Sequence, residues 1–291
     1  MKSTFKLTGI ADYITLGNAM FGTASIMFLI VAVEDMSQPY GQGLKSKYIW
    51  ASMLCIFLSA VGDIIDGPIA RRYSKRKLLG GSLDIMSDCL SFFVAPALMM
   101  FIMFGRWGEA APIWTVSLAI AGFWVIGTGM LRLARFQYEE GSGLPYFHGL
   151  SSPGNAILLM SAAGFIWLQP ILSFGPPLND VSVCVEGDCA ATPGLDMLIL
   201  PVMFLSGALM ITDRRLSKLK HGLDLKLSIL QMVCLLTAIL YALIRTGVSD
   251  NPIDLGNALA PPGWLFLASC LFAVYYLVKP QPPVYNPDVE E

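Results

Sequence analysis

Four carboxylates lie in a strongly apolar part of the chain, where an uncompensated charge is costly. Asp63 and Asp66 are three residues apart and Asp84 and Asp88 are four apart, so each pair would share one helix face. Such acids are retained only where a partner compensates for their lost hydration. Carboxylate oxygens are preferred ligands of hard divalent cations, and Mg²⁺ often adds phosphate oxygens from a substrate. The spacing therefore predicts a metal site that binds a phosphate-containing molecule.

Small and basic residues border these carboxylates. Gly67, Ala70 and Gly80 would let a ligand approach the backbone closely. Arg71 carries a guanidinium group whose planar donors match phosphate oxygens. The alternative is that the acids and arginines form ion pairs that only hold two helices together, but this does not account for the bordering glycines.

The composition indicates the elements that must position these residues. Hydrophobic residues make up 55% of the 291 residues and charged residues 14%, against about 25% charged in soluble domains. A helix needs about 20 residues to cross the hydrocarbon, and the sixth apolar stretch is short and contains Pro201. The stretches cover approximately 16–33, 48–66, 82–105, 112–133, 153–171, 197–212, 227–244 and 262–278. We expect an all-α polytopic membrane protein with about eight transmembrane helices.

The distribution of Lys and Arg predicts the orientation, because positively charged loops stay cytoplasmic. With the N-terminus inside, the basic loop 71–77 and the basic segment 214–226 lie on the cytoplasmic side, the latter as an anchor. The basic residues left outside are Lys45, Lys47, Arg106 and Arg245. Both termini are then cytoplasmic in a multi-pass protein of the cell membrane, and the first apolar stretch remains as a span without cleavage.

Three further features leave alternatives open. Residues 1–15 mix Lys with apolar residues, which suits either a short helix on the membrane surface or a frayed terminus. Asn18, in the first apolar stretch, would serve either helix packing or substrate contact. Cys184 and Cys189 lie in an outer loop, where an oxidising environment would permit a disulfide.

The acidic segment resembles the signature of the CDP-alcohol phosphotransferase family. That signature reads Asp-x-x-Asp-Gly-x-x-Ala-Arg and, after eight intervening residues, Gly-x-x-x-Asp-x-x-x-Asp, and the chain matches every fixed position from Asp63 to Asp88. Within the family the chain is similar to the membrane-embedded phosphatidylserine synthases over roughly residues 10–160. The residues that carry this similarity are Thr15, Asn18, Gly22, Ser91, Phe92, Ala95, Pro96, Ala97, Arg132, Arg135 and Phe136. The departures are Asp12, Lys77, Ser151 and Asn155, where the family more often has Asn, Ser, Pro and a small residue.

The resemblance implies a reaction and a domain organisation. A phosphatidyl-type group would pass from a CDP-linked lipid to the hydroxyl of serine, releasing CMP. The same head group occurs on CDP-diacylglycerol and CDP-archaeol, so the motif does not separate these donors. We expect one transmembrane domain over 1–291, with a core at 10–212 and additional helices at 227–278, in a homodimer that contacts membrane lipids and no nucleic acid.

The resemblance also assigns roles to residues. Asp63, Asp66, Asp84 and Asp88 would hold two Mg²⁺ or Mn²⁺ ions, and Asp88 would also take the proton of the attacking hydroxyl. The CDP-lipid would contact Asn18, Gly67, Ala70, Arg71, Lys77 and Gly80. The carboxylate of serine would bind near Arg132, Arg135 and His148. The alternative for the two arginines is that they reach toward lipid head groups.

Other functions stay open at this point. A related enzyme would use glycerol 3-phosphate or an inositol phosphate as acceptor, with extra cations such as Arg72 or Lys77 at its pocket. Outside enzymes, a divalent-metal transporter also places acids in membrane spans, but it favours the bilayer midplane and paired repeats. The acids of this chain cluster toward one predicted face, which favours the enzyme.

Overall fold

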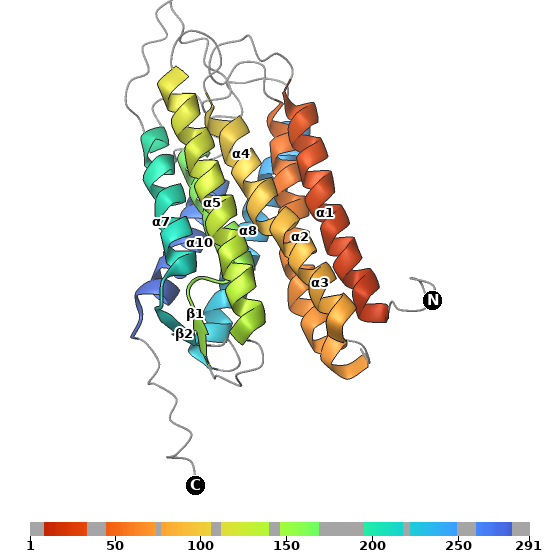
Figure 1. The fold of residues 1–291 in the computed structure, drawn as a ribbon. Coiled ribbons are helices and arrows are strands. Elements are labelled where there is room, and N and C mark those ends of the chain that lie inside the picture. Colours follow the sequence, from red (N-terminus) through yellow and green to blue (C-terminus); the bar gives the residue numbers. More distant parts are fainter. Residues whose placement is uncertain are drawn as a thin grey trace, which may run out of the picture.

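The computed structural model describes residues 9–33, 45–73, 77–105, 112–139, 146–168, 195–217, 222–248 and 260–280. These residues form a bundle of helices with one short ribbon (Figure 1). The helices are α1 (Ile10–Ala32), α2 (Ser46–Tyr73), α3 (Lys77–Asp88), α4 (Ala95–Phe104), α5 (Pro112–Glu139), α6 (Ser152–Leu168), α7 (Ile199–Ile211), α8 (Leu223–Val248) and α10 (Ala260–Val278). A π-helical turn, Cys89–Val94, joins α3 and α4 into one rod, and a 3-10 turn, Leu195–Leu198, leads into α7. The predicted all-α membrane fold is confirmed.

Six of the described helical rods are long and apolar enough to cross a membrane. The apolar helices α6 and α7 are shorter, with 17 and 13 residues. Pro201 lies in the first turn of α7, where the N–H that it lacks would have no partner within the helix anyway. The chain is therefore an integral membrane protein.

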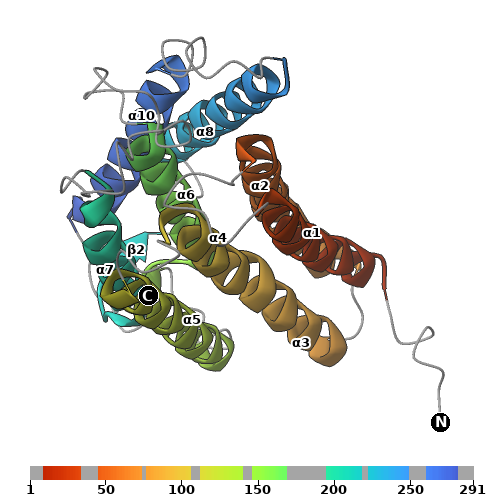
Figure 2. The ribbon, with the colours of Figure 1, turned by 90° about the horizontal axis from the view of Figure 1, so that it is seen from above.

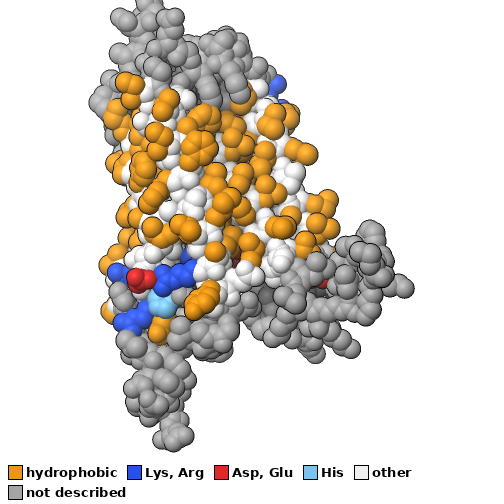
Figure 3. All heavy atoms as spheres, viewed as in Figure 1, with side chains coloured by type: hydrophobic (Ala, Val, Ile, Leu, Met, Phe, Trp, Pro, Cys, Tyr) orange, Lys and Arg blue, Asp and Glu red, His pale blue; other side chains and the backbone are white. Residues whose placement is uncertain are grey.

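The core forms around α6, which packs against α10, α7 and the π-helical turn (Figure 2). Buried aromatic rings fill the space between the helices: Phe104 meets Trp167 edge to face at 5.7 Å, and Trp50 stacks on Phe266 at 5.9 Å. On the outside, apolar side chains form a broad band (Figure 3). Such a band is expected where helices face lipid.

A two-stranded antiparallel ribbon lies at one end of the bundle, at the same end as the start of α3 (Figure 1). Strand β1 (Tyr146–His148) precedes α6, and β2 (Arg215–Ser217) follows α7, with His148 opposite Arg215. Gly149 has a φ of +71° and donates its N–H to Arg214 O at 2.8 Å. A Cβ at Gly149 would stand 2.4 Å from Met210 O, so the turn after β1 requires glycine. The sequence did not predict this ribbon.

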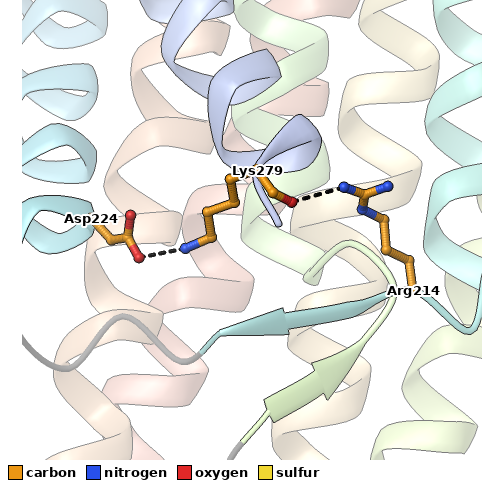
Figure 4. A network of polar contacts seen from close by, with 3 residues as sticks. All are labelled: Arg214, Asp224 and Lys279. Atoms are coloured by element: carbon orange, nitrogen blue, oxygen red, sulfur yellow. Dashed lines mark hydrogen bonds and ion pairs between the residues drawn. The ribbon is translucent and has the colours of Figure 1, made fainter. Parts of the chain in front are cut away.

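Two basic residues form polar contacts at the neighbouring ends of α8 and α10 (Figure 4). The Arg214 guanidinium donates to Val278 O at 3.1 Å and to Lys279 O at 3.0 Å, which satisfies carbonyls at the end of α10. The ammonium group of Lys279 pairs with Asp224 in the first turn of α8. Arg214, which belongs to the segment predicted as a charged anchor, and Lys279 therefore fasten the last two helices to the ribbon.

The expectation of a short surface helix over residues 1–15 is wrong for residues 10–15, and residues 1–8 lie outside the described residues. Residues 10–15 are the first turns of α1 and not a separate surface helix, because Asp12 accepts the N–H of Gly9 at 2.7 Å and caps the helix there. Helix α2 continues through Gly67 and Pro68 to Tyr73. Cys184 and Cys189 lie outside the described residues.

Candidate active site

Three of the four predicted carboxylates meet between α2 and the α3–α4 rod. One ligand oxygen each from Asp63, Asp84 and Asp88 lies within 4.8 Å of the others. Asp63 comes from α2, while Asp84 and Asp88 are one turn apart on α3 and so share a face. Asp88 is only 9% exposed, and the other two are half-buried. Three like charges this close are costly in a low-dielectric site, so the group favours a bound cation.

The other residues predicted around the acidic segment are described only as backbone. Asp66, Gly67, Ala70 and Arg71 lie within α2, and Lys77 begins α3. Their side chains lie outside what the structure describes, so their predicted roles remain predictions.

Helix α1 supplies a buried polar stripe beside the carboxylates. Asp12, Thr15 and Asn18 recur every third residue, and each is at most 6% exposed. The Ser87 hydroxyl of α3 donates to Thr15 O at 3.1 Å. Two further serine hydroxyls, Ser59 of α2 and Ser91 of the π-helical turn, donate to Asn18 O at 3.2 and 3.1 Å. These contacts hold α1 against both acid-bearing rods. Sequence reasoning missed Ser59 and Ser87, and it noted Ser91 only as part of the family resemblance.

Glycines allow this close approach of α1. A Cβ at Gly22 would stand 2.4 Å from Ser91 Oγ, and one at Gly80 would stand 2.8 Å from Asp12 Oδ1. Gly80 was predicted to leave space for the CDP-lipid, and its described neighbour is the Asp12 carboxylate. The small size of Gly80 is therefore explained by helix packing, while contact with the lipid remains a prediction.

A π-helical turn begins directly after Asp88. In this turn the N–H of Ala95 bonds to Leu90 O, five residues earlier. Turns of this kind arise where one residue is inserted into an α-helix, and they are frequent at functional sites. The turn sets the rotation of the acid-bearing α3 relative to the buried face of α4.

The predicted acceptor-binding residues lie at the end of α5 and on the ribbon. Arg132 is buried, and its Nε donates to Leu150 O at 3.1 Å. Arg135 forms an ion pair with Asp213, just after the C-terminal end of α7, with a distance of 2.7 Å between Nη1 and Oδ1. His148 on β1 packs edge to face on Tyr146 at 5.3 Å. Figure 3 shows Lys and Arg, with a histidine, gathered beneath the apolar band. The two arginines thus contact protein groups, and their role toward the acceptor remains a prediction.

Comparison with known proteins identifies the class. Residues 8–212 match the family model of the CDP-alcohol phosphatidyltransferases, and the chain belongs to this family.

The curated relatives that the chain resembles carry the names of serine-using members of the family. The chain is 30% identical over 162 residues to a CDP-diacylglycerol–serine O-phosphatidyltransferase of Saccharomyces cerevisiae, covering 53% of each chain. It is 30% identical over 160 residues to a protein of the same name from Methanocaldococcus jannaschii, covering 55% of this chain and 63% of the relative. It is also 30% identical over 113 residues to the archaetidylserine synthase of Methanothermobacter thermautotrophicus, covering 38% of this chain and 45% of that one. The chain thus spans about half of these relatives' length.

Proposed function

We propose that this protein transfers a phosphatidyl-type group from a CDP-linked lipid to the hydroxyl of serine and releases CMP. Family membership supports the reaction class, and the names of the relatives support serine as the acceptor. The observation that carries the proposal is the convergence of Asp63, Asp84 and Asp88 within 4.8 Å beside the polar stripe of α1. The donor is CDP-diacylglycerol or CDP-archaeol, since both present the same head group.

The carboxylate group fits the divalent metal that the family implies. All three donors are oxygens from separate side chains, which is the ligand set of Mg²⁺ or Mn²⁺ rather than of softer metals. Asp66, one turn after Asp63 on α2, would complete a set for two ions. When bound, these ions neutralise the charge of the pyrophosphate and of the departing CMP.

Asp88 is the proposed general base. The serine hydroxyl oxygen forms a bond to the lipid-bearing phosphorus, and the bond from that phosphorus to the CMP oxygen breaks. The hydroxyl proton passes to an Asp88 carboxylate oxygen, and CMP leaves with the bonding electron pair. Asp88 is the most buried of the three acids, so water competes least for its proton-accepting oxygen.

The remaining residues are proposed to hold the substrates. Asn18, Gly67, Ala70, Arg71, Lys77 and Gly80 would form the binding surface for the CDP-lipid. Arg132, Arg135 and His148 would bind the serine carboxylate. The ribbon supports this second role because it fixes His148 opposite Arg215, near the end of α5 that bears both arginines.

We also propose the setting in which the enzyme works. Because positively charged segments tend to stay in the cytoplasm, the basic residues beneath the apolar band support a site and termini on the cytoplasmic side of the cell membrane. Residues 10–212 would form the catalytic core, with the helices of 227–278 added to it, and two copies would associate as a homodimer in the membrane.

The deciding experiment measures CMP release by the purified full-length protein. The assay contains a CDP-lipid and Mn²⁺ or Mg²⁺, with serine, glycerol 3-phosphate or inositol phosphate offered separately. We expect release with serine and metal, and none after chelation with EDTA. Release with glycerol 3-phosphate or inositol phosphate but not with serine would reassign the acceptor. No release with any of them would overturn the proposal.

A further inference from the structure

Proline occupies a position in the α3–α4 rod where a backbone donor would otherwise be. Bonds in the π-helical turn run to the carbonyl five residues earlier, as from Ala95 N–H to Leu90 O. The next residue, Pro96, has no N–H to offer. The carbonyls one turn earlier, at Ser91 and Phe92, therefore receive no bond from residue 96.

Asn155 on α6 supplies a donor at this place. Its Nδ2 donates to Phe92 O at 3.4 Å across the helix interface. Asn155 is fully buried, and its Oδ1 has no hydrogen-bond partner among the described residues. Burying an amide oxygen without a hydrogen-bond partner costs free energy. The hydrogen bond donated by the amide nitrogen is therefore the reason to keep an asparagine at this position.

The same turn is held from two other helices. Ser91 within it donates to Asn18 O of α1 at 3.1 Å. The ring of Phe93 fits against Gly129 of α5, where a Cβ would stand 2.4 Å from Phe93 Cδ1. Restoring a regular α-helix would rotate the two flanking segments relative to each other by about 100°, the angle of one residue. Asp88 would then turn away from Asp63, which lies on a different helix.

We infer that Asn155 and Pro96 together fix the π-helical turn, and that this turn directs the face of α3 that carries Asp84 and Asp88 toward Asp63. Asn155 is thus a positioning residue for the carboxylate group, and it acts without touching the substrate. The inference rests on the proposed metal-binding function.

Direct titration of the purified full chain with Mn²⁺, followed by the paramagnetic resonance signal of free Mn²⁺, tests this inference. We expect Asn155→Ala to bind Mn²⁺ at least tenfold more weakly than the wild type. The matched control is Ser161→Ala, on the same buried helix, which loses a 2.8 Å hydrogen bond to Ser269 instead. This control should stay within twofold of the wild type. Activity of Asn155→Ala should recover when Mn²⁺ is raised.

Pro96→Ala changes the α3–α4 rod itself instead of its partner on α6. This variant replaces Asn155→Ala in the test if Asn155→Ala does not fold. It restores a backbone N–H and favours rewinding to an α-helix, so it should also weaken Mn²⁺ binding tenfold or more. Unchanged Mn²⁺ affinity in Pro96→Ala, or an Asn155→Ala affinity equal to that of Ser161→Ala, overturns the inference. A wild type that binds no Mn²⁺ would overturn the proposed function instead, so the two failures are distinguishable.

Discussion

Gly62 of α2 lies directly against Asn18 of α1: a Cβ on Gly62 would stand 1.9 Å from the Asn18 amide oxygen. The contact is next to Asp63 in the sequence and therefore ties the position of α1 to the carboxylate group. Close approach of this kind is how small residues bring membrane helices together.

Gly62→Ala should push α1 away from α2 and lower the free energy of unfolding by about 1–3 kcal/mol. The melting temperature and the Mn²⁺ affinity of the purified protein measure the effect, and both should fall. Gly17→Ala is the matched control, because nothing lies within 4 Å of a Cβ there. The double variant Gly62→Ala with Asn18→Ala should regain stability. Equal melting temperatures for the two glycine variants would contradict the described packing.

Gly80→Ala should have a smaller effect than Gly62→Ala. A Cβ at Gly80 meets only the far end of the Asp12 side chain, at 2.8 Å, and that carboxylate can rotate. The neighbouring Gly81→Ala, with open space around its Cβ, should keep or raise the melting temperature, because alanine favours the helix by about 1 kcal/mol. A Gly80→Ala melting temperature above that of Gly81→Ala would show that Asp12 does not fill this space.

Asp63→Asn should remove one of three clustered negative charges. Without metal we expect a higher melting temperature than in the wild type, since repulsion is relieved. Added Mn²⁺ should stabilise the wild type by about 2.7 kcal/mol at a hundredfold excess over its dissociation constant, and Asp63→Asn much less. Asp224→Asn, which breaks the pair with Lys279 instead, should keep the full response to Mn²⁺. A full Mn²⁺ response in Asp63→Asn would exclude Asp63 as a ligand.

Asp88→Asn should abolish CMP release while leaving CDP-lipid binding largely intact, because the amide cannot accept the hydroxyl proton. Turnover and CDP-lipid binding are measured separately on the same preparation. A normal rate would remove Asp88 from the role of base.

Arg135→Ala should raise the KM for serine about tenfold or more if Arg135 binds the serine carboxylate, and leave the KM for CDP-lipid unchanged. Its ion pair with Asp213 is partly exposed, so its loss should cost at most about 1 kcal/mol of stability. Asp213→Asn breaks the same pair but keeps the arginine, and it should retain the normal KM for serine. Equal KM values in both variants would leave Arg135 with a structural role only.

The helices could be predicted because each membrane helix must be apolar along its own length, whatever its neighbours. The ribbon could not, since its two short strands lie on either side of α6 and α7 in the chain and pair only in three dimensions. The start of α1 was missed because the capping role of Asp12 depends on a local bond that hydropathy does not report.

Part of the site could be predicted from spacing. Asp84 and Asp88 share a face at an interval of four, and an antiparallel neighbouring helix brings Asp63 to them. The interval of three from Asp12 through Thr15 to Asn18 was a signal for the polar stripe. Asn155 was noted only as a departure from the family, although a proline within an apolar stretch already implied a carbonyl in need of a donor.

The ribbon has a consequence for biosynthesis. During translation, β1 is made before α6, and its partner β2 follows only after α7. Residues 146–148 therefore stay unpaired until the nascent chain has been extended to Ser217, when the contacts of Gly149 with Arg214 and of Arg135 with Asp213 also become possible. Pairing of the two strands thus requires that α6 and α7 have already been synthesised, and until then the unpaired edge of β1 is open to pairing with another chain.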